Sequence, residues 1–79
     1  MTYDDFMSSF HNKILPNKET FIRHGQCLMS YLATVWKEEY VRLSSIHFYD
    51  RDDLDCFYRD ELIQNTVDHL SKVWVNYPN

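Results

Sequence analysis

Arg23 and Gln26 are the first residues whose types and spacing could support chemistry. They stand three positions apart, so a helix would place both on one face. The arginine fork and the amide suit a phosphate or a carboxylate, as in a small anionic ligand or a nucleotide. The pair can equally be a structural staple, and we favour this interpretation. In this structural interpretation, Arg23 pairs with an aspartate of residues 50–60, and Gln26 forms a hydrogen bond with the backbone of the same stretch.

A run of six carboxylates is the second group. Its members are Asp50, Asp52, Asp53, Asp55, Asp60 and Glu61. Alternating aspartates resemble a calcium loop, but that loop needs a glycine at its turn, and none occurs here. Interspersed Arg51 and Arg59 weaken a second hypothesis, mimicry of nucleic-acid phosphates. Two interpretations stay open, a solvated loop and an acidic rim that docks a basic partner.

Aromatic residues are unusually frequent, with two Trp, six Tyr and five Phe against one Gly. A small helical domain cannot hide every ring, and clustered exposed rings mark protein interfaces or self-association. Rings that lie flat over a thin core are an equally good explanation. We expect partial exposure for some of six rings, Tyr31, Trp36, Tyr49, Phe57, Tyr58 and Tyr77. The predicted partner-contact residues are Tyr49, Asp50, Asp52, Asp53, Asp55, Phe57 and Tyr58.

Histidine and cysteine residues show no pattern of a metal site or a catalytic centre. Zinc sites normally contain local pairs of ligands, and the chain has none. The residues concerned are His11, His24, His47, His69, Cys27 and Cys56. Acidic neighbours would raise the pKa of the Cys56 thiol rather than activate it beside His47. With no phosphate loop or nucleophile elbow either, we expect no catalytic residue, no metal and no cofactor.

The elements that must position these groups are predicted to be helices. Thr2, with Asp5 three residues on, predicts an N-cap, and Pro16 predicts a helix end at about Leu15. Asn17 then caps a second helix from about Lys18 to about Trp36, with a break near Lys37. Gly25 inside that helix costs about 1 kcal/mol relative to Ala, and its expected use is close approach of another element.

The rest of the chain is predicted to form a short third helix, a loop and a last helix. Residues 37–45 continue as the third helix. Residues 46–58 lack a clean period and are read as an ordered loop with one helical turn. Together with Arg59 and Asp60 they form the stretch that we call the acidic–aromatic segment. We expect this segment to lie across the second and last helices. Asp60 is predicted to cap the last helix, which ends near Trp74. The fold prediction is an all-α compact bundle of about four helices in a single domain, residues 1–79.

Length and charge narrow the classes of function. Seventy-nine residues with a net charge of −4 argue against a general nucleic-acid binder, which normally shows a basic face. Two cysteines cannot build a disulfide framework, no apolar run reaches membrane-span length, and acidic Asp4 and Asp5 do not suit a signal peptide. We therefore expect a cytoplasmic protein with no membrane contact and with both thiols reduced and buried.

Residues 23–74 resemble a family of small, mostly uncharacterised proteins of bacteriophage genomes and bacterial chromosomes. The shared pattern is R-x-G-Q-x-L-x-x-x-L, then a short helix, then D-x-F-Y-x-D, then a helix ending in Trp. Here its parts are Arg23–Leu32, Asp55–Asp60 and Trp74. The chain departs from the pattern at Cys56, where Pro is common, and in a longer connection at residues 44–53. The resemblance implies an all-helical fold and a phage or mobile-element origin, and it supplies no catalytic residue.

These observations lead to one main functional hypothesis and two alternatives. The main hypothesis is a non-enzymatic protein-binding module, a phage-encoded inhibitor or modulator of a host or defence complex, for example of CRISPR type. Its contact surface would be residues 50–61 with the neighbouring aromatic side chains. The first alternative is a binder of a small anionic ligand or nucleotide through Arg23 and Gln26. The second is a self-associating accessory protein whose exposed rings pair with one another.

Overall fold

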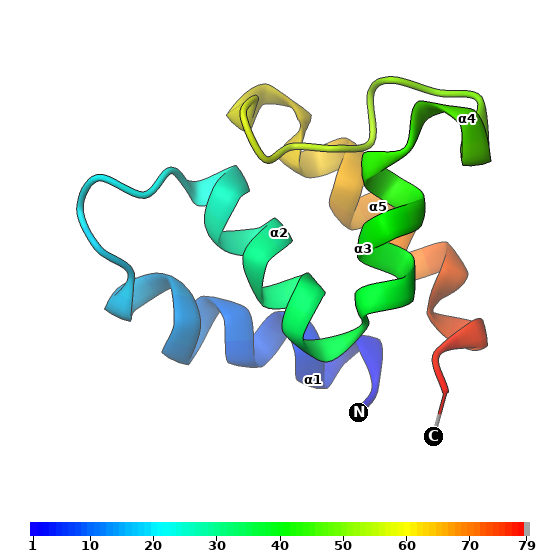
Figure 1. Ribbon diagram of the computed structural model, residues 1–79. Helices are drawn as coiled ribbons and strands as arrows, with labels where there is room; N and C mark the ends of the chain where they lie inside the picture. The colour runs from blue at the N-terminus through cyan, green and yellow to red at the C-terminus, as the bar shows by residue number, and fades with distance from the viewer. Residues whose placement is uncertain (79) are drawn as a thin grey trace.

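The computed structural model describes residues 1–78, and within this part of the chain every regular element is a helix (Figure 1). The α-helices are α1 (Tyr3–Ser9), α2 (His24–Val35), α3 (Lys37–Ser44), α4 (Ile46–Tyr49) and α5 (Ile63–Val73). The all-α prediction is confirmed. None of these helices combines the length and the apolar character needed to cross a lipid bilayer.

Helix α1 begins with the predicted cap. The Asp5 N–H donates to Thr2 Oγ1 at 3.0 Å, and the Thr2 N–H donates to the Asp5 carboxylate at 3.3 Å. A π-helical stretch, Phe10–Ile14, and a 3-10 turn, Leu15–Asn17, follow α1. Pro16 lies inside this last turn, because the first positions of a turn need no backbone donor. Asn17 does not start the next helix. Its side chain donates back to the Lys13 carbonyl at 2.5 Å and closes the first segment.

Helix α2 begins at His24, six residues later than predicted. Lys18 and Arg23 both have extended backbone, and the residues between them form an open connection. The predicted start was wrong because a helix continuing from Lys18 would carry the chain away from α1. The connection instead reverses the chain so that α2 returns alongside the first segment, as the cyan loop in Figure 1 shows.

The break after α2 and the loop after α3 agree with the sequence prediction. Trp36 has φ −146° and ψ 77°, so α2 stops there and α3 starts in a new direction. The acidic–aromatic segment contains one helical turn, α4, and is otherwise irregular up to Arg59. Asp50 follows α4 with φ 56°, a left-handed conformation that Asp adopts more readily than most residues.

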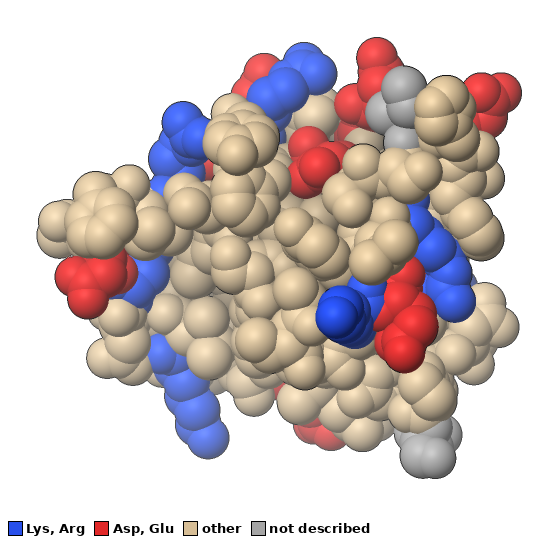
Figure 2. Space-filling view, viewed as in Figure 1, with Lys and Arg blue, Asp and Glu red and all other residues tan. Residues whose placement is uncertain are grey.

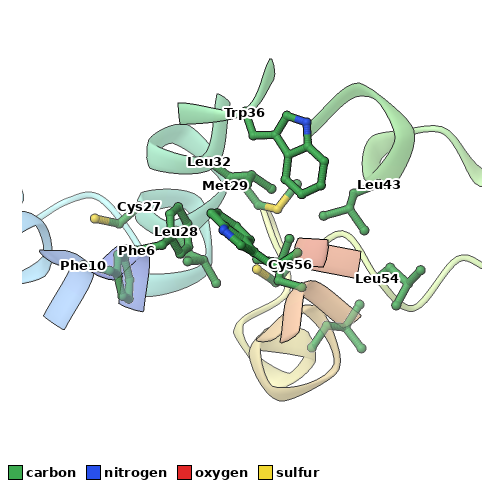
Figure 3. Packing of buried hydrophobic residues seen from close by; sticks show 13 residues of the cluster. Phe6, Phe10, Cys27, Leu28, Met29, Leu32, Trp36, Leu43, Leu54 and Cys56 are labelled. Carbon is green, nitrogen blue, oxygen red and sulfur yellow. The ribbon is translucent and has the colours of Figure 1, made fainter. Parts of the chain in front are cut away.

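The core lies where α1, α2 and α5 meet (Figure 3). Phe6 of α1, Leu28 of α2 and Leu70 of α5 are fully buried. Each such side chain contributes about 1.5–3 kcal/mol by leaving water. Trp36, one of the six rings of which some were expected to be partly exposed, is only 3% exposed, because its ring packs edge-on against Trp74 with the ring centroids 5.3 Å apart. Its burial shows that many of the rings are used to fill a small core.

Candidate interaction surface

The acidic–aromatic segment is anchored to the N-terminal end of α2 at Gly25. The Gly25 N–H donates to Asp60 Oδ1 at 3.0 Å, and the Cys56 thiol donates to the Gly25 carbonyl at 3.5 Å. A Cβ atom at position 25 would lie 2.0 Å from the Cys56 carbonyl oxygen. The predicted close approach at Gly25 is therefore confirmed, and the element that approaches is the backbone of this segment.

Asp60 caps α2 from a distance instead of capping the last helix. The last helix begins through a 3-10 turn, Asp60–Leu62, and Arg59 before it makes no side-chain cap. Gly25 belongs to the first turn of α2, where backbone N–H groups lack partners within the helix and the dipole is positive. The Asp60 carboxylate satisfies one of these donors. The predicted cap was wrong because the Asp60 carboxylate accepts from a backbone N–H in the first turn of α2 instead of from one in its own helix.

Arg23 and Gln26 do not form the predicted staple. The Arg23 guanidinium lies over the Tyr58 ring, 5.5 Å from its centroid, so it meets an aromatic face rather than an aspartate. Gln26 lines a groove beside α2. A staple between α2 and the segment does exist, but it is formed by the backbone of Gly25, which lies between Arg23 and Gln26 in the sequence. The two backbone stretches approach too closely for a longer side chain to fit between them.

A second anchor ties the segment to α5. The Thr66 hydroxyl donates to the Leu54 carbonyl at 2.6 Å, and Asn65 Nδ2 donates to the Asp53 carbonyl at 3.1 Å. Thr66 and Leu54 are buried, so this backbone carbonyl would otherwise be desolvated without a partner. The segment thus lies across the second and last helices, as predicted.

A buried carboxylate, Glu39 of α3, forms the third anchor. Glu39 is 1% exposed. Its Oε1 accepts from Arg42 at 2.7 Å, and its Oε2 accepts from the Tyr49 hydroxyl at 2.7 Å and contacts His69 Nε2 at 2.8 Å. Three helices, α3, α4 and α5, therefore meet on one carboxylate. Burial and the hydrogen bond to Glu39 raise the pKa of Tyr49.

Sequence reasoning missed this cluster, although one signal was present. Glu39 stands four residues before Leu43, so both lie on the inward face of α3, and both are buried. A charged residue at such a position must find partners. Tyr49, predicted as a partner contact, directs its hydroxyl into this cluster.

Three of the predicted contact residues surround one hollow of about 210 Å³, namely Asp52, Asp55 and Tyr58. Tyr58 is 75% exposed, and Asp52 is exposed as well. The wall of the hollow also contains Arg51 and Arg59. The surface therefore presents both signs of charge around an exposed ring.

The remaining predicted contact residues have local structural partners or stand apart. Asp53 is paired with Arg51 at 2.8 Å, which lowers the pKa of Asp53. Asp55 also accepts from the Phe57 N–H at 2.9 Å and holds the loop turn in place. The Phe57 side chain is half-buried, whereas Asp50 is exposed beside α4.

The net charge of the chain is concentrated on the stretch from Asp50 to Glu61. Its six carboxylates and two arginines leave a formal charge of −4, which equals that of the whole chain, so all other residues together are neutral. Figure 2 shows carboxylates along the upper edge of the molecule, where the acidic–aromatic segment runs. A charge confined to one surface creates a directed field.

The surroundings of the two cysteines disfavour their thiolate forms. Burial raises the pKa of Cys56, and Asp55 and Asp60 raise it further. Burial also raises the pKa of Cys27. Both thiols are free and buried, as expected. In the described part of the chain, no three His, Cys, Asp or Glu side chains are grouped so that they could hold a metal ion.

Comparison with known proteins gave no match. No protein-family model matches this chain, and neither a curated protein nor a solved structure matches it. The resemblance of residues 23–74 to phage and bacterial proteins stays a prediction.

Proposed function

We propose that this chain is a non-enzymatic protein-binding module that docks a basic partner through the acidic–aromatic segment. The observation that carries the proposal is the concentration of the whole net charge on residues 50–61, around the exposed ring of Tyr58. Complementary charge steers association, and a central aromatic residue supplies contact area at low entropic cost. The two features together are those of a docking surface.

The three anchors support the proposal because they order the segment before any partner arrives. The segment is held at its beginning by Glu39, in its middle by Thr66 and at its end by Gly25. A loop that is already ordered loses little conformational entropy on binding. A loop needed only as a connection would not require contacts with three separate helices.

The non-enzymatic part of the proposal is supported by the state of the nucleophiles. Cys56 is fully buried, its thiol is hydrogen-bonded, and its pKa is raised, all of which oppose reaction as a thiolate. The finer proposal, a phage-encoded modulator of a host or defence complex in the host cytoplasm, depends on the resemblance of residues 23–74 alone.

Charge reversal tests the surface. Asp52→Lys changes an exposed carboxylate at the hollow, whereas Glu38→Lys makes the same charge change on the exposed side of α3. Tagged wild-type protein should retain a basic partner from host lysate, the Glu38 variant should retain it equally, and the Asp52 variant should lose it. Higher salt should weaken capture. Equal capture by both variants would refute the proposed surface.

Asp52 is a better choice for this test than its neighbours. Asp53 is ion-paired with Arg51, so changing it also frees an arginine. Asp50 has a left-handed backbone, where a lysine is more strained. Asp52 alone reports on the surface charge.

The ligand-binding alternative receives less support from the geometry. Arg23 lies over Tyr58 while Gln26 faces the groove beside α2, so the two do not converge on one site. A thermal-shift panel of nucleotides tests this alternative, because a ligand that binds the folded state raises the melting temperature.

A further inference from the structure

Helix α2 contains no charged residue. Its twelve residues, His24–Val35, include no Asp, Glu, Lys or Arg, although a quarter of the chain is charged. The centre of the face shown in Figure 2, over α2, is correspondingly uncharged. Charged residues are depleted at the centres of protein interfaces. This face therefore differs in chemistry from the acidic–aromatic segment.

A groove of about 500 Å³ runs along the same helix. Three residues of α2 spaced by four, Gln26, Ser30 and Thr34, line this groove, and Ile14 and Ile22 add apolar side chains to its lining. The charged residues of the groove are Lys18 and Glu19, whose signs cancel. The groove offers apolar contact without net charge.

Phe21 supplies a ring beside this groove. Its side chain is 78% exposed, and it stands between Glu19 and Ile22, which both line the groove. An exposed phenylalanine next to an apolar groove places a projecting ring and a recess on one face. Such a face can be complementary to itself.

We infer that the α2 face, made of the groove and Phe21, binds a second copy of this chain, with Phe21 of each copy seated in the groove of the other. Two copies that each carry a charge of −4 repel one another when their acidic–aromatic segments face. The α2 face is a surface across which two copies can approach without opposing like charges. A two-fold axis near Ser30 makes the same residues serve both copies.

The size of the molecule suits this arrangement. A standard interface buries about 800 Å² of each partner. This is about a sixth of the surface of 5120 Å². The acidic–aromatic segment stays outside the contact, so the dimer would present it twice. The inference does not depend on the proposed function.

Analytical ultracentrifugation from micromolar to millimolar protein tests the inference. Wild-type protein should shift from the monomer mass of 9.6 kDa toward twice that mass. Phe21→Ser and Ser30→Arg should each raise the dimer dissociation constant about tenfold or more, since the first removes the ring and the second opposes like charges near the axis. Both residues are exposed, so the helical circular dichroism of the monomer should be unchanged.

Tyr58→Ser is the matched control, because Tyr58 is an equally exposed ring on the other surface. It should dimerise like wild type. Added salt should strengthen the dimer by screening the repulsion of two acidic chains, opposite to its effect on a basic partner. A monomer at every concentration, a dimer insensitive to both α2-face variants, or a dimer lost on changing Tyr58 would each overturn the inference. None of these results would bear on the charge-reversal test at Asp52.

Discussion

At the scale of single residues, Gly25 and Glu39 decide how the acidic–aromatic segment is held. Gly25 has no side chain where one would collide with the Cys56 carbonyl. Glu39 is a buried charge that three side chains satisfy. A buried polar group costs several kcal/mol when left unpaired, so each residue is critical for a different physical reason.

Gly25→Ala should lower the free energy of unfolding by about 3 kcal/mol, at the upper end for an overpacked site, because the neighbour that must move is backbone. Helix propensity alone predicts the opposite, a gain of about 1 kcal/mol. Urea denaturation followed by circular dichroism distinguishes the two. Ser30→Ala, on the exposed side of the same helix, is the control and should change stability little. A Gly25 variant as stable as wild type would contradict the packing seen here.

Tyr49→Phe should lower stability by about 2 kcal/mol, because the charged Glu39 loses one of its donors. Hydrogen exchange should accelerate most in residues 46–53, near the lost bond. Thr34→Val removes a hydroxyl that bonds only within its own exposed helix turn, and it should leave exchange there unchanged. Uniform acceleration along the chain would show that Tyr49 does not act locally.

At the scale of elements, the segment ties together helices that also meet in the core. Its end caps α2 through Asp60, and its middle bonds α5 through Thr66. Leu54 and Cys56 of the segment enter the core itself. The loop is therefore a structural layer of the fold as well as the proposed docking surface.

Thr66→Val tests this role of the loop. The change keeps the side-chain volume but removes the donor to the buried Leu54 carbonyl, and it should cost about 1–3 kcal/mol. Ser71→Ala is the control, because the Ser71 hydroxyl bonds an exposed carbonyl within its own helix. Thermal unfolding compares them. Equal melting temperatures for the two variants would mean that the segment is not anchored at α5.

At the scale of the whole molecule, the surface is divided by charge. Residues 50–61 carry the net charge of −4, and the α2 face carries no net charge. The two proposed contacts therefore respond to salt in opposite directions. Under the two proposals, the basic partner and the second copy would occupy separate surfaces and would not compete.

Alkaline pH should destabilise the whole molecule through its tyrosines. The pKa of Tyr49 is raised by burial, then by its bond to Glu39, and the pKa of Tyr3 is raised by burial. A raised pKa favours the protonated form in the folded state. This contribution to the free energy of unfolding is complete below the unfolded-state pKa of tyrosine, about 10. It is lost as the pH rises toward the higher pKa of the folded state.

Urea midpoints measured from neutral pH upward should therefore begin to fall above pH about 8.5, where the buried thiols lose their contribution, and should fall further above pH about 10, where the tyrosines do. The fall should be shallower in Tyr49→Phe, because only the contribution of Tyr49 is removed while those of Tyr3 and the buried thiols remain. Identical slopes for variant and wild type would place Tyr49 outside the buried cluster.

Local features were readable from the sequence because they depend on neighbours along the chain. The cap at Thr2, the break at Trp36, the glycine at a close approach and the irregular acidic–aromatic segment all follow from residue type and spacing within a few positions. The all-α class follows from the same short-range periodicity.

Only the tertiary structure decided which distant groups meet. Asp60 serves α2 rather than its own helix, Glu39 is buried among three helices, and the chain reverses before His24. These outcomes depend on how helices are oriented in space, and a carboxylate binds whichever donor the packing leaves unsatisfied. Spacing along the chain shows that Arg23 and Gln26 share a face, but only packing puts Gly25 between them against the loop.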